Sequence, residues 1–296
     1  MSKAVAETTQ TNHCDDTYNS SLIINTPDYN KVIDKVRSFF VLRDFQEVST
    51  QNRLSILAAC EDPFNVGTFN CANNKCWPLP QTGQMWLEYE LLSKPEVNGY
   101  FCLTTSYRLE KKPVNDRHQM IFPLFEFEMK GGIDALIELE KDLLVHLGYN
   151  SLQFVEESYN NLAKLYNVDE LEHKHETQLY KDLSPTFFIT RFPEFTNPFW
   201  NMKRNMNDNT SNKIDVILSG QETIGSAERE TSKSIMRNNF HSIMGGKYKE
   251  KLYELFGEER TLKELDDYLK FDFFPRCGGG IGMTRLMRSM KLENLI

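Results

Sequence analysis

A glycine cluster followed by an arginine lies near the C-terminus, in the run Cys277-Gly278-Gly279-Gly280-Ile281-Gly282-Met283-Thr284-Arg285-Leu286. Because glycine has no Cβ, its backbone can lie directly against a ligand. A helix is predicted over residues 282–291, and Arg285 falls about one turn into it. Its guanidinium can therefore reach back over Gly280 and Gly282 to a phosphate. A glycine-rich turn without a ligand is the alternative.

A group of charged and aromatic residues lies on a predicted β-hairpin, whose strands span residues 100–107 and 119–129. Residues of matching parity on paired strands share a face, so Arg108, Phe122 and Glu126 are expected to point into one site. Arg108 would hold a phosphate, and the Phe122 ring would stack on a flat base. A surface hairpin with charged residues at its tip is the alternative.

Acidic residues suited to a divalent metal ion are Asp215 and Glu222, separated by a predicted strand and a glycine. Mg²⁺ prefers oxygen ligands and keeps several waters, so two carboxylates brought together there could hold an ion that bridges phosphates. Seven residues past Glu222 lies Arg229, which could fix a carboxylate or carboxamide oxygen of a small substrate. Two solvated carboxylates at strand ends are the alternative.

The segment Thr82-Gly83-Gln84-Met85-Trp86-Leu87-Glu88 begins a helix predicted over residues 84–92, with Thr82 as the candidate N-cap. Gln84 and Glu88 are one turn apart and share a helix face, where they offer an amide and a carboxylate to a ligand. The start of an ordinary amphipathic helix is the alternative.

The elements that must position these groups are strands and helices mixed along the chain. They predict an α+β fold, an antiparallel β-sheet flanked by helices. Further helices are expected at 28–43, 133–147, 151–166, 229–240, 247–257 and 262–269. Further strands are expected at 45–48, 186–191, 199–204 and 213–219, with an irregular segment at 51–80 and a polar stretch at 168–183. Residues 1–26 are expected to be a disordered arm, and 27–296 to be one catalytic domain.

Composition bounds the class of protein. The chain has 296 residues, 40% hydrophobic residues and a formal net charge of −8. No run of eighteen apolar residues occurs, so no membrane span is expected. An acidic chain is a poor general binder of nucleic acid. Cys71 and Cys76 lack a second pair at finger-like spacing, so free thiols in a reducing cytoplasm are expected instead of a zinc site.

Taken together, these segments resemble the catalytic domain of class II aminoacyl-tRNA synthetases, in the branch for aspartate, asparagine and lysine. The Gly280 to Arg285 stretch is similar to the third motif of that class, whose arginine holds the ATP γ-phosphate. The second motif is similar to Arg108-x-Glu110 … Arg117-His118 … Phe122. Its first arginine grips the α-phosphate, its phenylalanine stacks on adenine, and Arg117 and His118 would close over the terminal phosphates.

The resemblance implies ATP and Mg²⁺ as cofactors, with the ion held by Asp215 and Glu222. It also implies a homodimer, because residues 36–50 are similar to the first motif, a helix and strand that form the dimer. The small amino acid would be held by Gln84, Glu88, Glu126 and Arg229.

Within that branch, asparaginyl-tRNA synthetases are most similar, through Thr82-Gly83-Gln84 … Glu88 and through residues 192–216. Aspartate-activating relatives carry a lysine where Leu87 stands, so a charge partner for aspartate is missing. Glu88 can instead accept a hydrogen bond from a carboxamide. The resemblance therefore implies activation of asparagine, or of aspartate, to an aminoacyl-adenylate.

Some residues depart from the family pattern: Gln51 replaces the usual proline, Ile121 a glutamate beside Phe122, and Thr284 a glutamate before Arg285. An anticodon-binding barrel has no counterpart in residues 1–27, so tRNA recognition in the usual way is not expected. An ammonia-dependent asparagine synthetase acting through aspartyl-adenylate is one alternative. A non-catalytic regulator that binds an amino acid is another. The acceptor of the activated amino acid stays open among tRNA, ammonia, a carrier protein and another amine.

Overall fold

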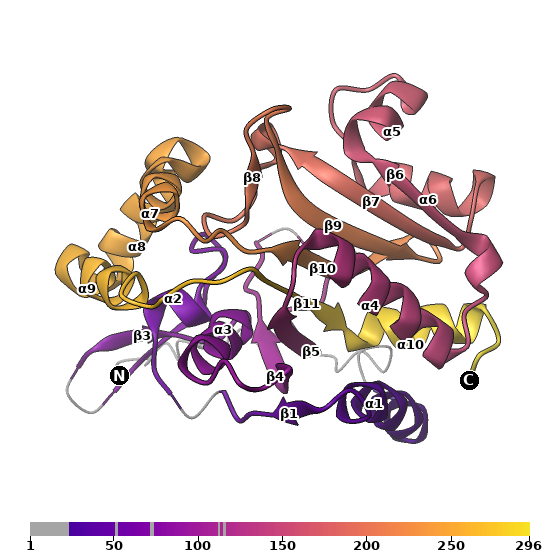
Figure 1. Cartoon of the computed structure of the whole chain (residues 1–296), viewed down its shortest axis with the longest axis horizontal. Helices are drawn as coiled ribbons and strands as arrows, with labels where there is room; N and C mark the ends of the chain where they lie inside the picture. Colours follow the sequence, from indigo (N-terminus) through magenta and orange to yellow (C-terminus); the bar gives the residue numbers. More distant parts are fainter. Residues whose placement is uncertain (1–23, 51–52, 72–73, 112, 115–116) are drawn as a thin grey trace, which may run out of the picture.

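One large β-sheet forms the centre of the molecule in a computed structural model that describes residues 24–296, except 51–52, 72–73, 112 and 115–116 (Figure 1). In the described part of the chain the strand order is β1-β4-β5-β11-β10-β9-β7-β6, and β8 pairs with β9. The pairings are antiparallel, except that β1–β4 and β6–β7 are parallel. The strands are β1 Phe45–Glu47, β4 Gly99–Tyr107, β5 Ile121–Lys130, β6 Phe154–Ser158, β7 Thr186–Pro193, β8 Arg204–Asn205, β9 Thr210–Leu218, β10 Gln221–Glu228 and β11 Arg276–Gly282. The predicted α+β class, an antiparallel sheet flanked by helices, is confirmed.

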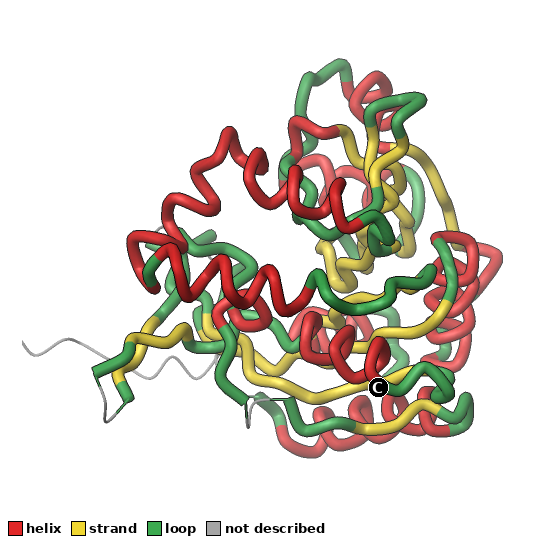
Figure 2. Tube along the Cα trace, turned by 60° about the vertical axis from the view of Figure 1, so that its left-hand side comes forward, coloured by secondary structure: helices red, strands yellow, loops and turns green. Residues whose placement is uncertain are grey.

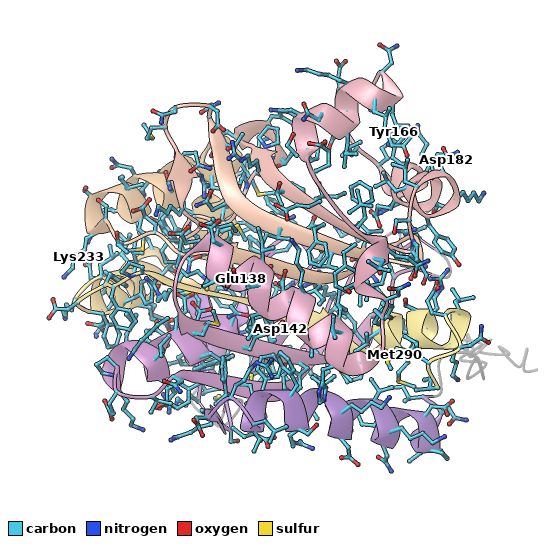
Figure 3. All side chains as sticks on the ribbon, turned by 45° about the vertical axis from the view of Figure 1, so that its right-hand side comes forward. Glu138, Asp142, Tyr166, Asp182, Lys233 and Met290 are labelled. Carbon is cyan, nitrogen blue, oxygen red and sulfur yellow. The ribbon has the colours of Figure 1, made fainter. Side chains whose placement is uncertain are left out.

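Three helices cover one face of the sheet: α1 Thr26–Val41, α4 Ile133–Leu147 and α10 Met283–Leu292. Their apolar residues pack with Phe125 and Phe127 of β5 in the largest hydrophobic core. Figure 3 shows α4, marked by Glu138 and Asp142, lying along the sheet, with Met290 marking α10 nearby. The helix α1 begins at Thr26, two residues before the predicted start at 28, because Asn25 accepts from the Asp28 N–H at 3.0 Å and a proline occupies the first turn.

A second group of helices packs around the fully buried Trp200 at one end of the sheet. These are α2 Ile56–Ala59, α3 Gln84–Ser93, α7 Lys233–Ser242, α8 Lys247–Phe256 and α9 Glu258–Tyr268. A small hairpin of β2 (Thr68–Asn70) and β3 (Cys76–Pro78) pairs only within itself and projects at the lower left of Figure 2.

At the other end of the sheet, α5 (Tyr159–Tyr166) and α6 (His173–Asp182) pack beside β7 in a smaller core. Among the described residues the short 3₁₀ helices are η2 Ser151–Gln153, η3 Glu194–Thr196 and η4 Ile243–Gly246. No helix among the described residues is both long and apolar enough to cross a membrane.

The glycine cluster forms the central strand β11 and not a turn. It pairs with β5 on one side and with β10 on the other. A Cβ at Gly278 would overlap Glu128 Oε2 and the Phe127 carbonyl, and one at Gly279 would overlap the Cβ of Ser226. The glycines are therefore needed for close approach of neighbouring strands.

Several predicted elements were wrong in detail. Residues 151–166 are not one helix, because β6 precedes α5. The polar stretch 168–183, for which no element was predicted, contains α6, and 199–204 is a turn that reaches a strand only at Arg204. The irregular segment 51–80 contains α2 and the β2–β3 hairpin. The greater part of the predicted disordered arm, residues 1–23, lies outside the described residues.

Candidate active site

A cavity of about 400 Å³ lies on the face of the sheet opposite the core formed with α1, α4 and α10, and the first turn of α10 reaches it through Thr284 and Arg285. Alternation along β5 explains this, because Phe125 and Phe127 enter the core while Leu124 and Glu126 line the cavity. All but two of the predicted site residues line it: Gln84, Arg108, Glu110, Arg117, His118, Phe122, Glu126, Glu222, Arg229, Gly280, Gly282 and Arg285. The exceptions are Glu88 and Asp215.

Two arginines stand at the cavity with part of their side chains exposed. Arg285 donates through Nη1 to the Glu222 carbonyl at 2.6 Å and through Nη2 to the Arg117 carbonyl at 3.1 Å. Arg108 donates to Glu61 Oε2 at 3.0 Å, and its guanidinium carbon lies 5.8 Å from the centre of the Phe122 ring. Neither guanidinium is enclosed, since these side chains are 26% and 39% exposed. Both can exchange protein partners for a ligand anion.

The predicted phosphate-closing pair is already engaged by protein groups. Arg117 donates to Glu176 Oε2 at 2.5 Å and to the Gly220 carbonyl at 3.1 Å. His118 Nδ1 lies 2.5 Å from Glu110 Oε2, and its ring meets the ring of His173 edge-on at 5.2 Å. In this arrangement Arg117 fixes the hairpin turn against α6, and both residues line the cavity.

The acidic pair meets at Gly225. A Cβ built there would lie 3.0 Å from Glu222 Oε1 and 3.8 Å from Asp215 Oδ1, so both carboxylates reach the same point of the floor. Asp215 is 8% exposed, and its Oδ1 has no hydrogen-bond partner. Burial raises the pKa of Asp215 to about 7 even though Lys213 opposes the rise. Burial also acts on Glu222, but Lys213 and Arg285 outweigh it and hold its pKa below the usual value.

These two carboxylates fit Mg²⁺ better than a metal held by protein alone. The described residues contain no group of three or more His, Cys, Asp or Glu side chains arranged around a metal ion. A buried carboxylate oxygen without a partner, Asp215 Oδ1, is the feature a cation would satisfy. Mg²⁺ is commonly bound by one or two carboxylates and completes its shell with water and phosphate oxygens.

Glu126 fixes the segment that enters α3. Its carboxylate accepts from the Gly83 N–H at 2.7 Å, from Thr104 Oγ1 at 2.7 Å and from Thr82 Oγ1. Burial raises the pKa of Glu126 against these three donors. Gly83, and not the predicted Thr82, is the N-cap of α3, although Thr82 Oγ1 accepts from the Gln84 N–H at 3.1 Å. With its acceptor positions occupied, Glu126 shapes the cavity wall more than it offers a free acceptor.

A buried group of four charges lies behind the wall. Arg276 donates to Glu88 Oε2 at 2.6 Å, and Arg229 donates to Glu128 Oε2 at 3.1 Å. Arg229 Nε is also 3.8 Å from Glu88 Oε1. Two carboxylates and two guanidinium groups leave the group with no net charge when all four are ionised. Burial opposes ionisation of Glu88, but the two arginines outweigh it and lower its pKa.

Direct contact of Glu88 with a ligand does not fit its position. Its carboxylate is fully buried and accepts from Arg276, from Tyr268 Oη at 2.7 Å and from Asn201 Nδ2 at 2.7 Å. Glu88 therefore acts on the cavity through Arg229. Gln84, one turn earlier on α3, does line the cavity and donates to the Phe127 carbonyl at 2.8 Å.

Three side chains were missed from the sequence: Lys213 and His173, which line the cavity, and Glu128, which is buried behind its wall. Lys213 and Glu128 follow the strand alternation of Asp215 and Glu126, so parity on β9 and β5 was a usable signal. His173 comes from the polar segment that folds as α6, and no local pattern distinguished it.

Comparison with known proteins agrees with this architecture. The family model described as tRNA synthetases class II (D, K and N) matches residues 7–296. Asparaginyl-tRNA synthetase from Pyrococcus horikoshii, complexed with asparaginyl-adenylate, superposes with a TM-score of 0.74 at 20% identity, covering 91% of this chain and 66% of that chain. The Entamoeba histolytica asparaginyl-tRNA synthetase with asparaginyl-adenylate gives 0.72 at 16% identity, covering 90% and 64%.

An aspartyl-tRNA synthetase from Entamoeba histolytica gives a TM-score of 0.66 at 16% identity, covering 89% of this chain and 54% of that chain. The chain thus spans between about half and two thirds of these solved structures. At such identities the superpositions establish the fold alone, whereas the family model covers nearly the whole sequence. This chain belongs to the class II tRNA synthetases of the D, K and N branch.

Proposed function

We propose that this chain uses ATP to convert asparagine to asparaginyl-adenylate. The observation that carries the proposal is the meeting of Arg108, Arg285, Phe122, Glu222 and Arg229 around one cavity of about 400 Å³. Phe122 lies on β5, Glu222 on β10 and Arg285 on α10, while Arg108 and Arg229 directly follow β4 and β10, so only the fold brings them together. Two solved relatives of the same fold are complexed with asparaginyl-adenylate, which supports the choice of reaction.

In the proposed reaction a carboxylate oxygen of the amino acid attacks the α-phosphorus of ATP. The new P–O bond forms as the bond to the bridging oxygen breaks, and pyrophosphate leaves with that electron pair. No covalent enzyme intermediate is needed, so positioning and charge neutralisation provide the catalysis. Mg²⁺ bound at Asp215 and Glu222 would neutralise charge on the phosphates.

The protein residues divide this work by their places in the cavity. Arg108 lies beside Phe122, so it would contact the α-phosphate while the ring stacks on adenine. Arg285, held above the strand floor by two carbonyls, would contact the γ-phosphate. His118 and Glu110, at the hairpin turn, would lie near the terminal phosphates, and Gly280 and Gly282 would allow close approach of the nucleotide.

The charges around Arg229 favour a carboxamide over a carboxylate as the substrate side chain. Arg229 is already paired with Glu128, and Glu88 lies 3.8 Å away, so the group offers no net positive charge. A second carboxylate placed there would lack a counter-charge and would face Glu128. A carboxamide can accept from Arg229 and donate to Glu128. Leu87, where aspartate-activating relatives carry a lysine, is fully buried and adds no charge.

The homodimer also remains a proposal. The α1 helix and the edge strand β1 would form the contact, and Val41 and Leu42 at the end of α1 are 53% and 75% exposed. Exposed apolar residues beside an unpaired strand edge are a suitable surface for a second copy. The described cysteines are free, which is consistent with a reducing compartment such as the cytoplasm.

Exchange of labelled pyrophosphate into ATP, screened over all twenty amino acids, tests the proposed function. Asparagine is expected to support the fastest exchange. Arg108→Ala is expected to abolish it, whereas Arg237→Ala, which removes an exposed arginine paired with Asp266 on α9, is expected to leave it unchanged. Retained exchange in Arg108→Ala would contradict the assignment of the α-phosphate contact.

The same assays separate the alternatives. Formation of AMP and asparagine from aspartate, ATP and ammonium would replace the proposal with an asparagine synthetase. Calorimetry that detects asparagine binding but no ATP binding would replace it with a regulator. Addition of tRNA to an exchange-competent enzyme tests tRNA as the acceptor.

A further inference from the structure

A lysine shares the acidic pair of the cavity. Lys213 precedes Asp215 by two residues on β9, so both side chains project from the same face. Its Nζ lies 2.7 Å from Asp215 Oδ2 and 3.9 Å from the centre of the Phe192 ring. The Lys213 side chain is 24% exposed and lines the cavity together with Glu222 and Arg285.

This position differs from those of Arg108 and Arg229, although Arg285 also lies 3.8 Å from a carboxylate of the proposed metal site, Glu222. Arg108 pairs with Glu61 and Arg229 with Glu128, carboxylates that have no part in the proposed metal site. Lys213 instead occupies one oxygen of Asp215 and leaves the other, Oδ1, buried without a partner. Asp215 therefore has one oxygen for the lysine and one for a further cation.

The ammonium changes the electrostatics of the pair. Asp215 and Glu222 alone would carry a charge of about −2 when ionised, and Lys213 reduces this to about −1. The Lys213 ammonium is paired with Asp215 at 2.7 Å, and a lysine ordinarily carries its charge at neutral pH. A fixed positive charge beside the pair repels a divalent ion and attracts a phosphate.

We propose that Lys213 is a tethered cation of the phosphate site, which shares Asp215 with the divalent ion and contacts the triphosphate. This inference rests on the proposed function. It predicts that Lys213 weakens binding of the divalent ion but strengthens binding of ATP. Without nucleotide the pair holds a divalent ion weakly, because Lys213 competes for Asp215. Without metal the cavity retains affinity for ATP, because Lys213 supplies part of the missing positive charge.

The variant Lys213→Met separates these effects at pH 8. Binding of Mn²⁺ to the nucleotide-free protein, followed by electron paramagnetic resonance, is expected to tighten about tenfold because a repulsive charge is gone. Binding of ATP in the presence of EDTA, followed by calorimetry, is expected to weaken by about tenfold or more. Lys213→Arg, which keeps the charge, is expected to restore metal-free ATP binding.

A matched control is Lys203→Met. Lys203, just before β8, pairs with Glu228 of β10 at 2.6 Å but does not line the cavity, so neither affinity should change. If Lys213→Met does not fold, Lys213→Gln carries the same test, because it keeps a donor to Asp215 without the charge.

Two outcomes separate this inference from the function on which it rests. If the wild-type protein binds ATP with Mg²⁺ but Lys213→Met matches it in both assays, Lys213 is only a structural partner of Asp215 and the inference is overturned. If the wild-type protein binds no ATP even with Mg²⁺, the proposed function itself fails.

Discussion

Replacing Gly280 by alanine tests whether the strand floor of the cavity is a nucleotide site. A Cβ at Gly280 would lie 3.4 Å from Leu124 Cδ1 and 3.5 Å from Glu126 Cγ, which is ordinary van der Waals contact. The φ angle of Gly280 is not in the positive range that favours glycine, so alanine causes no backbone strain there. The free energy of unfolding should therefore change by less than about 1 kcal/mol.

The same methyl group would project into the space where ATP is expected. Displacing a ligand from close contact with the backbone costs at least about 1.4 kcal/mol of binding free energy, which is tenfold in Kd. Gly280→Ala should thus weaken ATP binding tenfold or more in a protein of nearly normal stability.

Gly278→Ala is the matched contrast on the same strand. Its Cβ would overlap Glu128 Oε2 and the Phe127 carbonyl and would lie 2.8 Å from Gln84 Nε2. A backbone carbonyl in a sheet cannot move aside, so this variant should lose about 1–3 kcal/mol of stability. Urea unfolding and calorimetric titration with ATP, run on both variants, give the two quantities. Wild-type ATP affinity in Gly280→Ala would refute the placement of the nucleotide on this floor.

Other substitutions have separate expected outcomes. Burial raises the pKa of Glu140 from 4.5 to about 8, so its contribution to the free energy of unfolding is full below pH 4.5 and is lost as the pH rises to about 8. The free energy of unfolding, measured with urea, should therefore fall by roughly 1.4 kcal/mol per pH unit across that window, and Glu140→Gln should abolish the fall. An unchanged pH profile in the variant would contradict the burial argument. Glu88→Gln removes the charge paired with the fully buried Arg276 and should cost about 3–5 kcal/mol by the same assay, whereas a loss below about 1 kcal/mol would show that the pair contributes little. Arg285→Ala should weaken ATP binding about tenfold or more by calorimetry with little change in Tm, and unchanged affinity would remove Arg285 from the phosphate site.

The parts of the site that follow strand parity were predictable from the sequence. Arg108, Phe122 and Glu126 were assigned to one face of a hairpin, and all three line the cavity. The register supports this, since Ser106 pairs with Phe122 and Cys102 with Glu126. Local alternation is enough here because a β-hairpin connects neighbours in sequence.

The centre of the sheet was harder to predict. β10 contains Gly225, Ser226 and Ala227, and β11 contains three consecutive glycines, so both have low intrinsic preference for a strand. They form strands because β5 and β9 supply hydrogen-bond partners on either side. This pairing is a tertiary effect that cannot be predicted from a short segment of the sequence.

The role of Glu88 was beyond local reasoning for a related reason. Its partner Arg276 is 188 residues away in the sequence, and nothing near either residue indicates the pairing. Glu88 does share a helix face with Gln84, but the buried Arg276 occupies its carboxylate, so a ligand cannot contact it. By contrast, Asp215 and Glu222 meet through the turn at Ser219 and Gly220, which the glycine indicated.

A crystal structure of the protein with ATP and Mg²⁺ would test most directly whether the cavity is one triphosphate site. We expect adenine on the ring of Phe122, the α-phosphate at Arg108, the γ-phosphate at Arg285 and the metal ion between Asp215 and Glu222. Nucleotide bound elsewhere, or its phosphates turned away from both arginines, would contradict the account.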